Sequence, residues 1–184
     1  MRIIAGDARG RKIEAPEGKH TRPTLDRIRE NIFNILQNEI RQSRILDLFA
    51  GSGALSLEAL SRGALNAVMV DSDRKANNVQ KRNTDLLHYT DRVRICCCDW
   101  ARAVKTFQEE HMQFDIVFLD PPYVMTDLRD VFSALVPVIH QDTLIVLEHE
   151  SGCDIRIPDG FDVVKDRTWG FCAATIYRMI TEGE

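Results

Sequence analysis

The sequence has no apolar run close to the roughly 18 residues that a membrane-spanning helix needs. Its first residues, MRIIAGDARGRK, also lack the hydrophobic stretch of a secretory signal peptide. We therefore expect a cytoplasmic protein with no membrane partner. The 184 residues, 44% of them hydrophobic, are enough for one globular domain with a sizeable core and too few for a second full domain.

Cysteine and histidine are not spaced as a disulfide framework or a metal site would require. The five cysteines are an odd number, and three of them are adjacent at positions 96 to 98. We therefore expect reduced thiols that are mostly buried. His20 and His88 have no Cys or His partner at metal-ligand spacing, and Glu148-His149-Glu150 is not the helical H-E-x-x-H arrangement. The sequence accordingly predicts no metal site.

Positive charge is scarce overall but concentrated near the start of the sequence. The formal net charge is −4, which by itself disfavours a polyanionic partner. Residues 1–44, however, hold ten Lys or Arg against six Asp or Glu. Such asymmetry points to a nucleic-acid surface, although a solvated, mildly basic leader explains the charge equally well. The candidates for binding phosphates are Arg9, Arg11, Lys12, Arg22, Arg27 and Arg29.

Hydrophobic periodicity predicts alternating strands and helices from residue 45 onward. Five short apolar runs are typical of buried strands, at residues 45–49, 67–70, 92–96, 115–120 and 143–148. Helical segments lie between and after them, near residues 54–62, 73–87, 100–110 and 127–139. Alternation of this kind predicts a parallel sheet with helices on both faces.

The two ends of the sequence depart from this alternation. Near the carboxyl end, strand-like runs at 161–167 and 171–179 are joined by only three residues, which predicts an antiparallel hairpin at the edge of the sheet. Near the amino end, residues 2–4 and 11–13 flank a turn rich in Gly and Asp and indicate a small arm or hairpin. We expect a flexible connection over residues 14–22 and then a helix that Pro23 opens.

A glycine-containing loop follows the first predicted strand, in the segment Asp47 to Gly53. Open α/β sheets bind ligands at this carboxyl edge, and glycine lets a ligand approach the backbone closely. Asp71 ends the second strand, where a carboxylate can accept both hydroxyls of a ribose. Asp99 follows the third strand, within reach of an adenine amino group. These strand ends could therefore bind methionine, ribose and adenine in turn.

Two other interpretations of this loop stay open at this point. A lone Gly-x-Gly after a strand also marks a tight turn with close helix packing. In addition, Gly51-x-Gly53-x-x-Ser56 falls one residue short of the NAD-binding fingerprint. A dinucleotide fold is disfavoured because the third glycine is replaced by serine and because that fold has no terminal hairpin.

The tetrad Asp120-Pro121-Pro122-Tyr123, directly after the fourth predicted strand, is the most specific signal in the sequence. An amine conjugated to a base ring is a poor nucleophile because its lone pair is delocalised into the ring. Asp120 and the carbonyl of Pro121 can accept its two N–H bonds and aim the lone pair at a sulfonium methyl group, and the fixed φ of proline holds both acceptors still. Tyr123 offers a flat face to a base turned out of its stack. The alternative is an ordinary Pro-rich turn.

Together these motifs resemble those of class I methyltransferases that act on exocyclic amines. Further segments are similar to those of the RsmD family of 16S ribosomal RNA guanine-N2 methyltransferases. These segments are Arg2 to Gly6, Gly10 to Lys12, Arg22 to Thr24, Asp26 to Glu30, Phe33-Asn34 and Trp169-Gly170. The resemblance spans essentially the whole sequence.

The resemblance implies a Rossmann-like α/β fold with a seven-stranded, mostly parallel sheet and a carboxyl-terminal antiparallel hairpin. A small amino-terminal arm over residues 1–22 would precede a catalytic core over 23–184, in one domain. S-adenosylmethionine is implied as the donor, with the segment Arg22 to Thr24 over its pocket. Trp100 departs from the small residue usual after the third-strand acid. The cofactor-binding residues expected are Arg22, Thr24, Asp47, Phe49, Ala50, Gly51, Ser52, Gly53, Asp71, Ser72, Cys98, Asp99 and Trp100.

The acceptor implied by the resemblance is a guanine of 16S ribosomal RNA, as free RNA or in the small ribosomal subunit, and we expect a monomer. One alternative is an adenine-N6 methyltransferase on DNA or RNA, since the same tetrad serves either base. The other is a non-catalytic RNA-binding assembly factor, against which the intact acidic residues argue. The residues expected to act are Asp120, Pro121, Pro122 and Tyr123 in catalysis, and Arg9, Arg11, Lys12, Arg22 and Arg27 in RNA binding.

Overall fold

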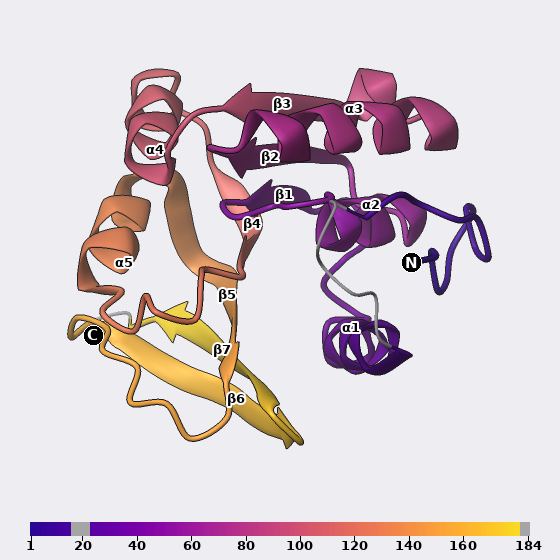
Figure 1. Cartoon of the computed structure of the whole chain (residues 1–184). Helices are drawn as coiled ribbons and strands as arrows, with labels where there is room; N and C mark the ends of the chain where they lie inside the picture. The colour runs from indigo at the N-terminus through magenta and orange to yellow at the C-terminus, as the bar shows by residue number, and fades with distance from the viewer. Residues whose placement is uncertain (16–22, 181–184) are drawn as a thin grey trace.

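A seven-stranded sheet forms the centre of the computed structural model, which describes residues 1–15 and 23–180 (Figure 1). The strand order is β3-β2-β1-β4-β5-β7-β6, with β1 to β5 parallel and β7 antiparallel to both β5 and β6. This confirms the mostly parallel sheet and the terminal hairpin predicted from the sequence. The strands are β1 Arg44–Asp47, β2 Asn66–Asp71, β3 Val93–Cys97, β4 Phe114–Leu119, β5 Ile139–Glu150, β6 Phe161–Trp169 and β7 Cys172–Met179.

Helices cover both faces of the sheet, as alternation of strands and helices requires. One buried cluster joins α1 and α2 to the sheet, and Phe33 of α1 packs on Phe118 with ring centroids 5.7 Å apart. A second cluster joins α4 and α5 to the opposite face, where Phe107 packs on Phe114. The helices are α1 Pro23–Ile35, α2 Ala54–Ser61, α3 Arg74–Leu87, α4 Trp100–Glu109 and α5 Arg129–Leu135, with 3₁₀ turns η1 Thr90–Arg92 and η2 Val136–Val138.

The fifth strand begins earlier than the sequence predicts. The helical segment expected to reach residue 139 ends at Leu135, η2 follows, and β5 starts at Ile139 opposite Phe114. Thr143 supports this extension, because its hydroxyl donates to the carbonyl of Phe114 at 2.7 Å and accepts from the amide of His140 at 2.9 Å. Pairing with β4 therefore overrides the local helical pattern.

The amino-terminal arm lies on α2 and forms the small hairpin expected. It has an antiparallel bridge between Arg2 and Lys12, and the amide of Ile3 donates to the carbonyl of Arg11 at 3.0 Å. Glu58 of α2 accepts hydrogen bonds from the amides of Ile4 at 2.8 Å and Ala5 at 3.1 Å. Gly6 has a φ of +87°, and a Cβ there would lie 1.7 Å from the carbonyl oxygen of Ser61. Only glycine fits so close an approach.

The connection expected over residues 14–22 lies mostly outside the described residues, because residues 16–22 are not among them. Glu14 is described, and it is held against α3. Its amide donates to Asn83 Oδ1 at 2.8 Å, and its carbonyl accepts from Asn83 Nδ2 at 3.0 Å. The described part of the arm is therefore anchored to both α2 and α3.

The five cysteines are free thiols, as expected, but the expectation that most are buried is wrong. Cys172 is buried, Cys97 is exposed, and Cys96, Cys98 and Cys153 are half-buried. The reason is that Cys96 and Cys97 lie on β3, with Cys98 directly after it, and this edge strand of the sheet is only partly covered by helices.

Candidate active site

The glycine loop joins the end of β1 to the start of α2 at the carboxyl edge of the sheet. Gly51 has a φ of +52°, and a Cβ built there would meet nothing within 4 Å, so this backbone borders open space. The amide of Gly51 donates to Asp71 Oδ2 at 2.8 Å, and the other oxygen of Asp71 accepts from the amide of Asp73 at 2.8 Å. The loop and the end of β2 are thus tied together around one carboxylate.

Asp47 lies beneath this loop with 1% of its surface exposed. Ser56 donates to its Oδ2 at 3.0 Å, while its Oδ1 has no hydrogen-bond partner among the described residues. Burial raises the pKa of Asp47 to about 7, and the nearby charge of Asp71 adds to the rise, against the opposing bond from Ser56. A buried acid in this state favours a cationic ligand group, whose charge would stabilise the carboxylate.

The third acidic strand end belongs to Asp99, which caps α4 by accepting the amide of Arg102 at 2.9 Å. Strand register places it near the other two: Asp47 pairs with Met69, and Asp71 pairs with Cys97. Asp99 is exposed, and its neighbours Cys98 and Trp100 are half-buried. The three carboxylates expected from the sequence therefore follow three neighbouring strands at one edge.

The other loop residues named from the sequence lie in the same place. Phe49 is half-buried and packs against the cluster that α4 and α5 form, while Ala50 and Ser52 are buried. The amide of Ala50 donates to the carbonyl of Val70 at 3.0 Å, so the loop is anchored to β2 as well as β1. Ser72 is exposed directly after Asp71.

The tetrad follows β4 at the same edge. Asp47 pairs with Phe118, so Asp120 stands two residues beyond the partner of Asp47. Pro121 is buried, whereas Tyr123 is 55% exposed in a turn that the bond from the amide of Met125 to the carbonyl of Pro122 closes at 2.7 Å. The tetrad and the glycine loop thus border one region of the sheet edge.

The ionisation of Tyr123 is set by its acidic surroundings. Partial burial raises its pKa to about 12, and the charges of Asp120, Cys172 and Glu148 add to the rise. The phenol therefore keeps its proton at neutral pH, and its ring stays uncharged beside Asp120. An uncharged aromatic face is what stacking on a base requires.

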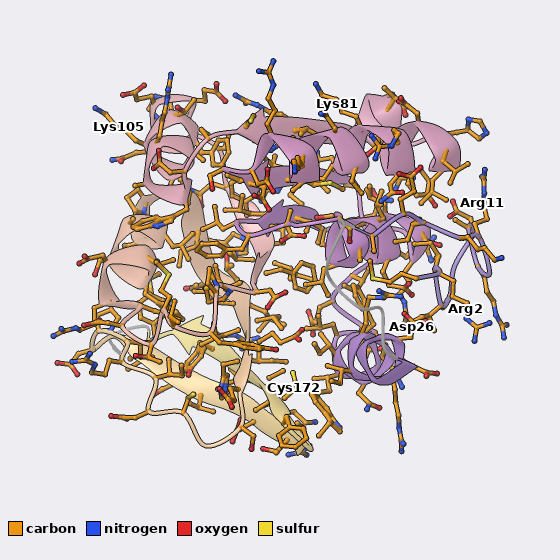
Figure 2. The ribbon with its side chains drawn as sticks, in the orientation of Figure 1. Arg2, Arg11, Asp26, Lys81, Lys105 and Cys172 are labelled. Carbon is orange, nitrogen blue, oxygen red and sulfur yellow. The ribbon has the colours of Figure 1, made fainter. Side chains whose placement is uncertain are left out.

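Two residues at this site were not predicted from the sequence, Glu148 and Cys172. Leu119 pairs with Leu147, which places Glu148 beside Asp120 at the ends of neighbouring strands. The thiol of Cys172 donates to Glu148 Oε1 at 3.2 Å. Cys172 is the first residue of β7 and is labelled in Figure 2. The strand-end rule that identified Asp47 and Asp71 also applies to Glu148, the last residue of the fifth predicted strand.

His149, next to Glu148, is engaged in the hairpin. Its Nε2 lies 2.9 Å from the hydroxyl of Thr175, and its Nδ1 lies 3.0 Å from the carbonyl of Glu150. Within the described ranges, His, Cys, Asp and Glu side chains do not gather in a group of three or more that could hold a metal ion.

Basic side chains of the arm and α1 surround a hollow of about 510 Å³. Arg2, Arg9 and Arg27 line it together with Asp26 and Glu30. Arg11 points away to α3, where its guanidinium donates to the carbonyl of Leu86. Figure 2 shows Arg2, Arg11 and Asp26 on this side of the molecule. Exposed Arg9 and Arg27 are thus placed to meet an anionic surface.

Arg29, also named from its charge, is buried with 5% of its side chain exposed. It donates to Asp26 Oδ1 at 3.0 Å and lies 3.8 Å from Glu58. The expectation that Arg29 binds phosphate is therefore wrong, because its guanidinium is used inside the protein. Lys12 is exposed, whereas Arg22 and the side chain of Thr24 lie outside the described residues.

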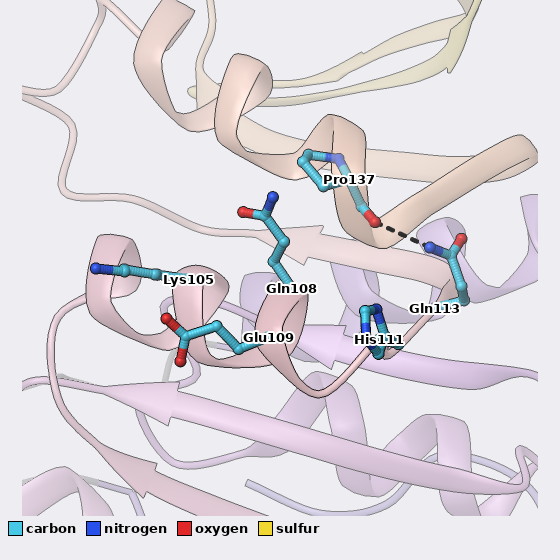
Figure 3. A pocket seen from close by; sticks show the side chains of 6 residues that line it. All are labelled: Lys105, Gln108, Glu109, His111, Gln113 and Pro137. Carbon is cyan, nitrogen blue, oxygen red and sulfur yellow. Dashed lines mark hydrogen bonds between the residues drawn. The ribbon is translucent and has the colours of Figure 1, made fainter.

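A second hollow of about 580 Å³ lies between the end of α4 and η2 (Figure 3). Gln113 donates there to the carbonyl of Pro137 at 2.9 Å. Because this region precedes β4 and β5, it lies at the amino edge of the sheet, opposite the carboxylates and the tetrad. The hollow is lined by Lys105, Gln108, Glu109, His111, Gln113 and Pro137.

The chain is similar in sequence to one known protein family and to relatives that are named as ribosomal RNA methyltransferases. A family model described as "Conserved hypothetical protein 95" matches residues 1–178. A Bacillus subtilis protein named "Putative rRNA methyltransferase YlbH" is 36% identical over 97% of this chain and 98% of its own length. The Escherichia coli protein named "Ribosomal RNA small subunit methyltransferase D" is 33% identical over 100% of this chain and 92% of its own length.

Solved structures agree with the sequence relatives. The structure titled "Putative methyltransferase yhhF from Escherichia coli" superposes with a TM-score of 0.83 at 32% identity and covers 97% of both chains. In the described part of the chain, no helix has both the length and the apolar content needed to cross a lipid bilayer.

Proposed function

Because this chain belongs to the RsmD family of methyltransferases, we propose that it methylates the exocyclic N2 amine of a guanine in 16S ribosomal RNA. The chain is a methyltransferase, and S-adenosylmethionine is its methyl donor. One observation carries the assignment to an exocyclic amine: the tetrad from Asp120 to Tyr123 stands at the same sheet edge as the glycine loop.

The residues at the edge fit the donor. S-adenosylmethionine, when bound, supplies a methyl carbon on a positively charged sulfur that retains the electron pair of the broken C–S bond. Asp47 has a buried oxygen without a hydrogen-bond partner among the described residues. Its carboxylate suits the ammonium group at the methionine end of this molecule. Asp71 would accept the ribose hydroxyls and Asp99 the adenine amino group. The open space at Gly51 leaves room for a ligand against the backbone.

Around this part of the site we assign donor contacts to the residues identified from the sequence. Phe49, Ser72, Cys98 and Trp100 are exposed or half-buried and lie within two residues of these carboxylates in the sequence. Ala50, Ser52 and Gly53 are buried and shape the loop itself. That Arg22 and Thr24 cover the donor stays a prediction from the resemblance, because Arg22 and the side chain of Thr24 lie outside the described residues.

On the acceptor side, Asp120 and the carbonyl of Pro121 would each accept one N–H of the amine. This draws the nitrogen toward tetrahedral geometry and directs its lone pair at the methyl carbon. As the N–C bond forms, the nitrogen becomes positively charged and releases one proton, which Asp120 accepts and passes to water. The Tyr123 ring would stack on the base. The fixed φ angles of Pro121, which is buried, and Pro122, which is exposed, would hold the position of Asp120.

The basic arm would bind the phosphates that flank the target base. Arg9 and Arg27 line the hollow between the arm and α1. Lys12, which follows Arg9 closely in the sequence, is exposed. Arg11 and Arg22 complete the set expected from the sequence. We further propose that the whole chain acts as one cytoplasmic domain and as a monomer, on 16S ribosomal RNA or on the small subunit that contains it.

The test is methyl transfer from labelled S-adenosylmethionine to small subunits from a strain that lacks the protein, followed by mapping of the label. The proposal predicts N2-methylguanosine at one position of the 16S RNA. Label recovered as N6-methyladenosine would favour the adenine alternative instead. If calorimetry detected no binding of S-adenosylmethionine, a non-catalytic assembly factor would be favoured.

A further inference from the structure

Glu148 stands next to Asp120 at the active-site edge. Leu119 and Leu147 pair across β4 and β5, so the next residues along the two strands are Asp120 and Glu148. Leu119 and Leu147 both pack in the cluster that α4 and α5 cover. Since side chains alternate between faces along a strand, Asp120 and Glu148 point together to the opposite face, toward α1 and α2.

The surroundings of Cys172 and Tyr123 support this placement. Burial raises the pKa of Cys172, and the charges of both Glu148 and Asp120 raise it further, so one thiol senses both carboxylates. The Cys172 thiol stays protonated and donates to Glu148 Oε1 at 3.2 Å. Tyr123 senses the same two carboxylates. The two acids and the exposed ring therefore border one space.

The Watson–Crick edge of guanine presents two kinds of donor side by side, the N2 amine and the N1–H. Adenine presents a lone pair at N1 beside its N6 amine. Neighbouring strands lie about 4.8 Å apart, a spacing that suits two carboxylates accepting from adjacent groups of one base edge. A carboxylate carries about four acceptor positions, so Glu148 can accept from a base while it accepts from Cys172.

We propose that Glu148 accepts the N1–H of the target guanine and thereby selects guanine over adenine. With the amine held by Asp120 and Pro121, the adjoining ring nitrogen lies against Glu148. A guanine N1–H satisfies this carboxylate, whereas the N1 lone pair of adenine faces it with like charge and no hydrogen bond. The inference rests on the proposed function, because it names the feature of the base that the same site reads.

The test uses a base that keeps the N2 amine but lacks the N1–H. Small subunits are reconstituted with 16S RNA in which the mapped target guanosine is replaced by 2,6-diaminopurine riboside, and kcat/KM is compared with that for guanosine. The wild-type enzyme should prefer guanosine by about 10- to 100-fold, because the half-buried Glu148 is left without its N1–H donor on the analogue.

The Glu148→Gln enzyme should lose this preference, to within about threefold, since its amide can turn to donate to N1 of the analogue or accept from guanine. Asp142→Asn, which removes an exposed carboxylate from the amino end of the same strand, should keep the wild-type ratio. Calorimetric affinity for S-adenosylmethionine and the melting temperature should be unchanged in both variants.

Equal kcat/KM of the wild-type enzyme for the two bases would overturn the role of Glu148 and leave guanine-N2 transfer standing. The same holds if Glu148→Gln keeps the full preference. Transfer to adenosine and none to guanosine would refute the proposed function and this inference together. If the Glu148→Gln protein fails to fold, Glu148→Ala takes its place and should also lose the preference. A variant is needed because the analogue also replaces O6 of guanine with an amine.

Discussion

At the scale of single residues, the site changes the protonation of Asp47 near neutral pH. Its burial raises the pKa to about 7, so near neutral pH much of it is protonated in the donor-free protein. The folded pKa lies above the unfolded value, so the stability that this proton contributes is complete below about 3.8 and is lost as the pH rises through about 7. A positively charged ligand group would lower the pKa of Asp47, because it stabilises the ionised carboxylate.

We therefore expect S-adenosylmethionine to bind about tenfold more weakly at pH 6 than at pH 8, because only a minority of Asp47 is ionised at the lower pH. Isothermal titration calorimetry at the two pH values measures this. The Asp47→Asn protein should show a smaller difference, since the titrating group is gone. An identical pH dependence in the two proteins would show that Asp47 does not bind the donor.

Single residues also show how far the sequence leads. Asp47, Asp71, Asp99 and Asp120 could be predicted because each lies near the carboxyl end of a predicted strand, and parallel strand ends share an edge. Arg29 could not be placed from charge alone. Its helical position, four residues before Phe33, puts it on the buried face of α1. Its nearer acid, Asp26, lies on the same helix, but its contact with Glu58 of α2 has no local signal.

At the scale of elements, Glu58 joins the amino-terminal arm, α1 and α2. Its side chain is fully buried, accepts from two arm amides and pairs with Arg62 at 2.7 Å and Arg29 at 3.8 Å. Such a buried carboxylate leaves uncompensated positive charge and unpaired amides when it is neutralised. Ser61 and Asn83 also hold the arm to the core, through hydrogen bonds from the amides of Ala8 and Glu14.

Glu58→Gln should lower the free energy of unfolding by about 3 kcal/mol, because the amide cannot accept at both of its terminal atoms. Chemical denaturation measures this, and hydrogen exchange of the amides of Ile4 and Ala5 should accelerate with it. Glu39→Gln, at an exposed position after α1, serves as the matched control. If Glu58→Gln had the stability and amide exchange of the wild-type protein, as Glu39→Gln should, Glu58 would not hold the arm to the core.

The elements themselves were largely predictable, because hydrophobic period and strand-helix alternation are local properties. The position of β7 between β5 and β6 was not given by periodicity, since strand order depends on pairing between distant segments. The early start of β5 was missed for the same reason. Glu148 could have been identified as the last residue of the fifth predicted strand, but its place beside Asp120 depends on the register of β4 and β5.

At the scale of the whole molecule, charge is divided between an acidic sheet edge and a basic arm. Figure 2 shows Lys105 far from the side that carries Arg2 and Arg11. An RNA held by the arm would present one base to the edge, where the carboxylates repel phosphates. This division explains how a protein of net charge −4 can bind a polyanion.

Arg27→Gln should weaken binding to small-subunit RNA and reduce the slope of log affinity against log salt by about one, if Arg27 contacts a phosphate. Filter binding over a range of salt concentrations measures the slope. Lys105→Gln removes one charge from the far hollow and should leave the slope unchanged. If the wild-type, Arg27→Gln and Lys105→Gln proteins gave equal slopes, Arg27 would not contact a phosphate of the RNA.

The positioning of a base amine by Asp120 is tested most directly by measuring donor affinity and methyl transfer in the same Asp120→Ala preparation. Affinity for S-adenosylmethionine should stay within about twofold, while transfer to small subunits should fall at least about 10²- to 10³-fold, as when one preorganised hydrogen-bond group is removed. Asp130→Ala, exposed on α5, should retain both properties. Transfer at the wild-type rate by Asp120→Ala would contradict the proposed mechanism.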